Sequence, residues 1–160
     1  MEIEMTIKGL MIDPITNMPI VVLRDAQGQR LLPIWVGVFE ANAIALQMEN
    51  VQTPRPMTHD LIKNILEGLD AVVERVVVCA LKDNTFYATI ALRLGGSTRL
   101  VDSRPSDAIA LALRMGAPIF VDELVIQSAR SFEMAESADT GRLQKWLEGL
   151  SEEELGKYKM

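Results

Sequence analysis

The chain has 160 residues, of which 49% are hydrophobic, 24% charged and 5% aromatic, which is the balance of a globular domain with an aliphatic core. Because no apolar run approaches the roughly 20 residues of a membrane-spanning helix, and the N-terminus lacks a signal-peptide pattern, we expect a cytoplasmic protein with no membrane partner. The net charge of −6 argues against a large basic nucleic-acid surface, so any such contact needs a local basic cluster, a metal ion or both.

Three strands are predicted in the first third of the chain, in the apolar stretches IEMTIKGLMI, MPIVVLRD and LLPIWV. A helix follows from Phe39 to Glu49 and is apolar on nearly every side, which is typical of a buried helix. After the extended linker TPRP, Thr58 is a good N-cap for a second helix that ends near Leu69. The apolar stripe of this second helix consists of Leu61, Ile62, Ile65, Leu66 and Leu69.

The same order of elements returns in the second half. Three strands are predicted at Val72–Leu81, Thr85–Arg93 and Thr98–Asp102, followed by an apolar helix from about Pro105 to Met115 and a short closing strand, PIFV. The sequence EANAIAL in the earlier helix aligns with PSDAIAL in the later one. We therefore interpret the chain as a tandem duplication of a three-strand-plus-helix unit, forming an α+β fold with a mixed, largely antiparallel sheet and buried helices.

The end of the chain differs in character. We assign residues 1–130 to the folded domain and residues 131–160 to an acidic linker and a short helical tail. Gln127–Thr140 is typical of a linker or a loosely packed helix, and Trp146 would anchor a short amphipathic helix. We expect this tail to dock on its own domain or on a neighbour.

The chain has one cysteine and one histidine. These numbers exclude an intramolecular disulfide, a zinc site built from several cysteines and a multi-histidine metal site. Cys79 lies in the apolar sequence VVVCA, which predicts a buried, unreactive thiol. Glycine-rich phosphate loops and the common hydrolase motifs are absent from the sequence, so most familiar enzyme sites are excluded.

The first of three polar clusters is the sequence RPMTHD at the start of the second predicted helix. Thr58 and Asp60 fit a simple helix cap. A functional interpretation makes His59 a general base or metal ligand, with Asp60 orienting it or binding the metal. Arg55 and the free amides of the helix start would suit a phosphate.

The second cluster, DSRPSD, joins a strand to a buried helix. Asp102 and Asp107 could share a divalent ion while Arg104 neutralises a phosphate. Alternatively, Asp107 caps the helix and Asp102 pairs with Arg104. The third cluster is the equivalent junction of the first repeat, where Glu40 fits a helix-dipole partner and matters for chemistry only if the duplication brings the two junctions together.

Several long blocks in this order resemble one family. LPIWVGVFEANAIALQME, PRPMTHDLIKNIL and DSRPSDAIALALRMGAPIFV, with GLMIDP and DNTFYA, strongly resemble the bifunctional nuclease domain family over about residues 1–130. Bacterial members of that family are small single-domain proteins, and plant members are reported as nucleases that act on both RNA and DNA. The resemblance implies a nuclease with nucleic acid as its partner, and it supplies no catalytic residues.

The resemblance and the polar clusters together give the hypothesis of a metal-assisted phosphodiester hydrolase that uses Mg²⁺ or Mn²⁺. The expected catalytic groups are His59, Asp60 and Asp102, the expected metal ligands are Glu40, Asp102 and Asp107, and the expected phosphate-binding residues are Arg55 and Arg104. The alternative is a non-catalytic oligomeric module that binds a small anionic ligand or a protein partner. A third hypothesis is a purely structural oligomer assembled through its strand edges and tail. A homodimer fits all three hypotheses, because a short strand-rich domain has sheet edges to cover.

Overall fold

The computed structural model describes the backbone of residues 1–135 and the side chains of residues 1–129, so the predicted helices of the tail lie outside the described residues. The strands are β1 Glu2–Ile12, β2 Pro19–Asp25, β3 Leu31–Trp35, β4 Val72–Lys82, β5 Thr85–Leu94, β6 Ser97–Ser103 and β7 Ile119–Asp122. The helices are α1 Val38–Met48, α2 Thr58–Gly68, α3 Pro105–Met115 and α4 Glu123–Ala135.

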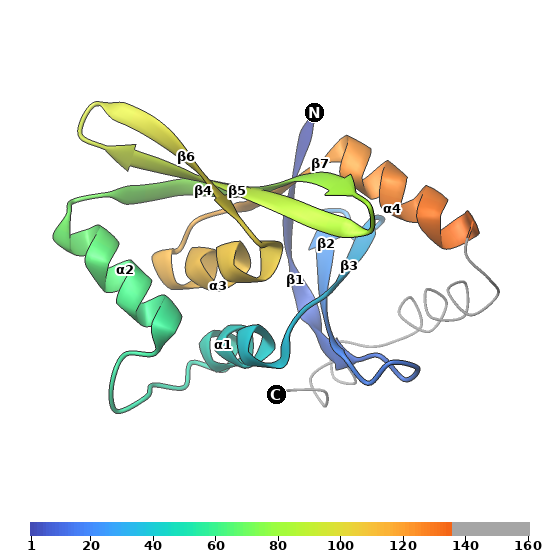
Figure 1. Ribbon diagram of the computed structural model, residues 1–160, viewed down its shortest axis with the longest axis horizontal. Coiled ribbons are helices and arrows are strands. Elements are labelled where there is room, and N and C mark those ends of the chain that lie inside the picture. The colour runs from blue at the N-terminus through green and yellow to red at the C-terminus, as the bar shows by residue number, and fades with distance from the viewer. Residues whose placement is uncertain (136–160) are drawn as a thin grey trace.

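The strands form one sheet in the order β3-β2-β1-β7-β4-β5-β6 (Figure 1). Each repeat is an antiparallel three-stranded meander followed by a helix, and β7 joins the two meanders by pairing antiparallel with β1 and parallel with β4. The structure thus confirms the predicted α+β fold, its mixed and largely antiparallel sheet, and the repeated unit.

The two repeat helices, α1 and α3, pack against each other, and α3 also packs on β4 and β5. Ile44 of α1 and Ile109 of α3 are fully buried, as expected for helices that are apolar all round. The start of α4 adds the buried side chains of Val125 and Ile126, so the polar stretch that begins at Gln127 continues a docked helix as far as Ala135. Within the described residues, no helix is long and apolar enough to cross a membrane.

Two local predictions are wrong. The N-cap of α2 is Met57 rather than Thr58, and the Asp60 carboxylate accepts a hydrogen bond from the Met57 N–H at 2.9 Å, because an acidic residue three positions after the cap can reach back to it. The Cys79 thiol is exposed. Side chains alternate along a strand, and since Val78 faces the core, Cys79 points to the other face of the sheet.

Helix α2 is less buried than the other helices of the two repeats. His59 is its only buried residue, and of the predicted apolar stripe Leu66 alone is among the side chains packed against the core. The remaining members of the stripe are 36–60% exposed: Leu61, Ile62, Ile65 and Leu69. The stripe is therefore present, but all of its members except Leu66 lie largely outside the described core.

Candidate functional site

A cavity of about 640 Å³ opens between α1, the start of α2, α3 and the end of β6. Its walls include the apolar side chains of Leu46, Ile62, Ile90 and Leu111. Its polar lining combines residues from all three sequence clusters: Glu40, Asn42, Thr58, His59, Asp102, Ser103, Arg104 and Asp107. The duplication therefore does bring the two strand-to-helix junctions together.

Arg104 links the two repeats inside this cavity. It precedes Pro105, which keeps its backbone extended and outside the helix. Its guanidinium donates from Nη2 to Glu40 Oε1 at 2.7 Å and from Nε to Asp107 Oδ2 at 2.8 Å. Because the Arg104 side chain is 64% exposed, such pairs contribute only about 0–1 kcal/mol to stability. Their main effect is to fix the positions of the two carboxylates.

His59 and Asp107 form a second contact in the cavity, with Nε2 and Oδ1 2.9 Å apart. Burial raises the pKa of Asp107, but hydrogen bonds from His59 and Arg104 outweigh it and hold that pKa below its ordinary value. Asp107 is therefore ionised at neutral pH and can only accept, so the proton lies on His59 Nε2. In a neutral imidazole the other nitrogen, Nδ1, then carries a free lone pair.

Glu40 is held over the start of its own helix. Hydrogen bonds from Arg104 and from the Glu40 backbone N–H lower the pKa of this carboxyl. The side chain folds back over Gly37, where an added Cβ would overlap Glu40 Oε2. The absence of a side chain at Gly37 thus leaves the space that the Glu40 carboxylate occupies.

Asp60 points into a different cavity, of about 290 Å³. Its Oδ1 accepts a hydrogen bond from Arg114 Nε at 2.7 Å. The Arg114 side chain, only 3% exposed, also donates to the carbonyls of Ala110 and Ala43 at 2.9 and 3.0 Å. Arg114 therefore ties α1, α2 and α3 together, and it does so next to His59.

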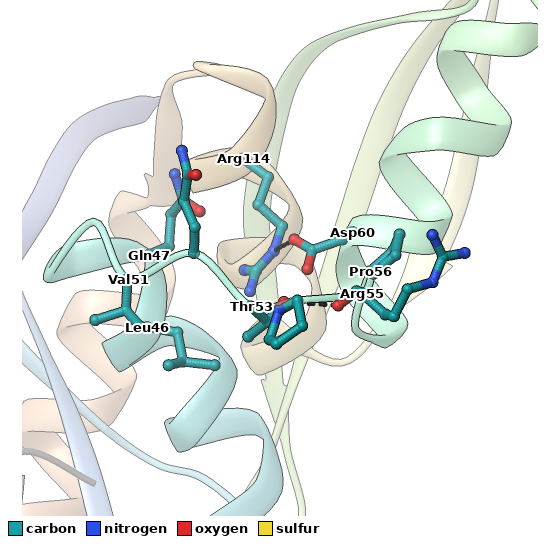
Figure 2. Close-up of a pocket in the computed structure, with 10 residues that line it drawn as sticks. Leu46, Gln47, Val51, Thr53, Arg55, Pro56, Asp60 and Arg114 are labelled. Carbon is teal, nitrogen blue, oxygen red and sulfur yellow. Dashed lines mark hydrogen bonds and ion pairs between the residues drawn. The ribbon is translucent and has the colours of Figure 1, made fainter.

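Arg114 is not among the residues expected from the sequence, although a signal is present there. Arg114 stands in the helix sequence ALALRMG, which is otherwise apolar and expected to be buried, and buried arginines are almost always paired. Arg55 lines the same smaller cavity, and Figure 2 shows its guanidinium pointing away from Asp60 and Arg114. Asp60 and Arg55 are thus separated from the other candidate residues.

The alternative interpretation of the DSRPSD cluster is wrong. Arg104 pairs with Glu40 and Asp107 rather than with Asp102, and the start of α3 has no side-chain cap. Asp102 lines the larger cavity with no hydrogen bond or ion pair among the described side chains. Among residues 1–129, no group of three or more His, Cys, Asp or Glu side chains is arranged to hold a metal ion.

The family model of the bifunctional nuclease domain matches residues 21–134. The chain belongs to this family. It is 41% identical over 126 residues to an uncharacterised protein of Mycobacterium tuberculosis, covering 79% of this chain and 75% of that protein. Residues 21–134, which the family model matches, include every polar residue that lines the larger cavity.

Plant relatives carry nuclease names. The chain is 32% identical over 114 residues to bifunctional nuclease 1 of Arabidopsis thaliana, covering 69% of this chain and 35% of that protein. It is 30% identical over 129 residues to bifunctional nuclease 2 of the same plant, covering 78% of this chain and 38% of that protein. The family resemblance predicted from the sequence is therefore confirmed.

Proposed function

We propose that the chain hydrolyses phosphodiester bonds of RNA and DNA in the larger cavity. Family membership and the names of the plant relatives support a nuclease. The observation that carries the proposal is the convergence of Arg104, the His59–Asp107 pair and Glu40 in one cavity, from three separate segments of the chain. The larger cavity thus combines a phosphate-binding cation with a candidate general base.

Arg104 is the group that would bind the phosphate. A guanidinium has five N–H donors, and the Arg104 bonds to Glu40 and Asp107 use Nε and Nη2. Nη1 has no hydrogen bond or ion pair within the described residues, and the side chain is 64% exposed. Arg104 can therefore contact a phosphate oxygen while both carboxylates hold it in place.

His59 would act as the general base. Asp107 keeps the proton on Nε2, so Nδ1 can accept a proton from a water molecule that attacks the phosphorus. The bond from phosphorus to the leaving oxygen breaks, and that oxygen takes a proton from solvent. In this scheme Asp60 is a positioning residue, because it fastens the first turn of α2 to Arg114 and so fixes the neighbouring His59.

A divalent metal would have to arrive with the substrate. Glu40 and Asp107 are already engaged by Arg104, so the side chains as they lie do not form a carboxylate metal site. Mg²⁺ commonly binds one or two carboxylates together with substrate phosphate oxygens, and Asp102 is the available carboxylate. We therefore propose Mg²⁺ or Mn²⁺ as a neutraliser of phosphate charge beside Asp102.

The test is cleavage of labelled single-stranded RNA and DNA by the native chain and by Arg104→Ala, Arg104→Lys and His59→Ala. We expect Arg104→Ala and His59→Ala to lose about 100-fold or more of the activity, the usual cost of removing a transition-state donor or a general base. Lys keeps the charge but cannot bridge Glu40 and Asp107, so Arg104→Lys should recover only part of it. Parallel reactions with Mg²⁺, Mn²⁺ and EDTA measure the metal dependence.

The matched control is Arg93→Ala, which removes an exposed arginine of β5 that pairs with Glu74 outside the cavity. Each variant is purified identically, so a contaminating nuclease would give equal cleavage in all samples. Equal cleavage by the native chain, Arg93→Ala and Arg104→Ala would contradict the proposed site.

One observation favours a second candidate function, binding of a small anionic ligand without catalysis. The cavity volume, about 640 Å³, lies in the range of small-molecule pockets, which are mostly apolar with a few fixed polar groups. Calorimetric titration with mononucleotides separates the two functions: saturable binding that Arg104→Ala abolishes, without cleavage of any oligonucleotide, would favour the binding module.

We also propose that the chain forms a homodimer. The support is β6, an edge strand of the sheet whose residues 97–102 are exposed within the described part of the chain. Proteins usually cover or protect such edges.

A further inference from the structure

The two edges of the sheet differ in how they are protected. At one edge, β3 contains Pro33, and the three middle residues of that strand are buried. At the other edge, six of the seven residues of β6 are exposed, including Leu100 at 73% and Val101 at 41%. The register of β6 against β5 is continuous, without a bulge, and β6 contains no proline. It therefore lacks two of the usual devices that stop an edge from pairing, a proline and a bulge.

A second apolar surface lies at the same end of the molecule. Leu61 and Ile65 of α2 and its C-cap residue Leu69 are spaced four residues apart, so they form one line along the helix, and each is more than half exposed. Figure 1 shows α2 at the same end as the β5–β6 hairpin. The connection is direct, because Ile62 of α2 and Val101 of β6 line the same cavity.

We propose that a second copy of this chain covers both features, with the two β6 strands paired antiparallel about a two-fold axis and the α2 stripes facing each other. This inference rests on the proposed homodimer and adds its surface and register. An isologous contact requires a self-complementary patch. The sequence STRLVDS meets that requirement electrostatically, because its charges, Arg99 and Asp102, cancel.

Strand geometry selects the register. Directly opposite residues in a continuous antiparallel sheet must lie on the same face, and among the registers that satisfy this condition one pairs all seven residues of β6. In that register Leu100 lies opposite Leu100 of the partner subunit, and Ser97 lies opposite Ser103 of the partner subunit. Asp102 lies opposite Thr98 of the partner subunit, so no like charges meet in this register.

A standard interface buries roughly 800 Å² per partner. The proposed contact therefore uses both surfaces, the exposed apolar side chains of α2 and those of β6. A partner of this kind removes both the unpaired strand edge and the apolar helix face from water.

The first measurement is the mass of the native full-length chain by sedimentation equilibrium, with a dimer of twice 17.8 kDa expected. The second is cross-linking of Leu100→Cys in a Cys79→Ala background. Opposite residues of antiparallel strands have Cα atoms about 4.5–5.5 Å apart, within the disulfide range, so we expect most chains to cross-link under mild oxidation. The control is Ile15→Cys in the same background, a position in the β1–β2 loop that is 64% exposed.

Leu100→Lys and Ile65→Lys should each weaken the dimer by at least about 100-fold, because each buries a charge at the contact, with unchanged circular dichroism. A dimer in which Leu100→Cys cross-links no better than Ile15→Cys would overturn the proposed surface and leave the homodimer intact. A monomer at high protein concentration would overturn both. Neither result bears on nuclease activity, which the Arg104 and His59 variants test separately.

Discussion

The two repeats share one topology but protect their third strands differently. Trp35 in β3 and Leu100 in β6 occupy equivalent places, 65 residues apart. The Trp35 indole donates to Asp13 Oδ2 at 2.8 Å, and Asp13 also binds the hydroxyl of Thr16 and the backbone of Ile15. Leu100 is 73% exposed. The first repeat is thus closed by a polar contact, whereas the second leaves its edge open for assembly.

The helix starts of the two repeats are complementary rather than identical. Phe39 in the first repeat stands where the second has Arg104. Each start supplies one carboxylate, Glu40 or Asp107, and the single guanidinium of Arg104 binds both. Divergence after duplication has therefore placed the cation in one repeat only, so the cavity needs both repeats to form.

The largest effect on stability is expected from breaking the ion pair between Asp60 of α2 and Arg114 of α3. Asp60→Ala leaves the Arg114 guanidinium buried without its counter-ion, which should lower the free energy of unfolding by about 3 kcal/mol. Urea denaturation followed by circular dichroism measures this change. In the double variant Asp60→Ala with Arg114→Met the buried charge is gone, so the loss should be smaller than the sum of the two single losses. Additive losses would show that the two side chains are not coupled.

Trp35→Phe should have a smaller effect, about 1–2 kcal/mol, because it keeps an aromatic ring in β3 but removes the N–H that binds Asp13. The measurement is again urea denaturation. Asp13→Asn provides the comparison, since an amide can accept from Trp35 but brings no charge. If Trp35→Phe were as stable as the native chain, the polar contact would not be what closes the first repeat.

Acid should destabilise both repeats, for the same reason. Burial raises the pKa of Asp13, but hydrogen bonds from Trp35, Ile15 and Thr16 bring it below the ordinary value, and the pKa values of Glu40, Asp60 and Asp107 are lowered as well. The unfolded chain then binds more protons than the folded one. Stability is present above about pH 4 and is lost as the pH falls through the lower, folded-state values.

Thermal unfolding midpoints measured at about pH 6 and about pH 3 test this prediction. The two pH values lie on either side of the pKa of an unperturbed carboxyl group, about 4. Asp13→Asn in the first repeat and Asp107→Asn in the second should each reduce the drop between the two midpoints. If both variants showed the same drop as the native chain, the acid sensitivity would not come from these carboxylates.

Much of the fold could be predicted because local signals and packing agree. Helix α3 runs from Pro105 to Met115 as expected, since proline favours the first turn and Gly116, at φ 66°, ends the helix in the left-handed region. The exposure of α2 could not be predicted, because an apolar stripe shows that a partner exists and not which chain supplies it.

The residue types of the candidate site could be predicted from the sequence, but the contacts between these residues could not. Glu40, His59 and Asp107 come from three segments, and which of them meets Arg104 depends on how α1 and α3 pack. Adjacent residues of one helix turn, His59 and Asp60, face two different cavities. The different orientations of these two side chains follow from tertiary contacts, above all from the contact of Asp60 with the buried Arg114. The spacing of residues along the sequence does not predict them.

The smallest effect is expected at Gly37. Its φ of −70° suits any residue, so Gly37→Ala acts only through the added Cβ, which would displace the flexible Glu40 carboxylate. We expect a change of less than about 1 kcal/mol in unfolding free energy but a measurable loss of cleavage, because Arg104 loses one of its two anchors. Gly68→Ala, where a Cβ meets nothing within 4 Å, is the control. In a Glu40→Gln background, which already weakens the bond to Arg104, Gly37→Ala should cost less activity; an undiminished loss would mean that Gly37 acts independently of Glu40.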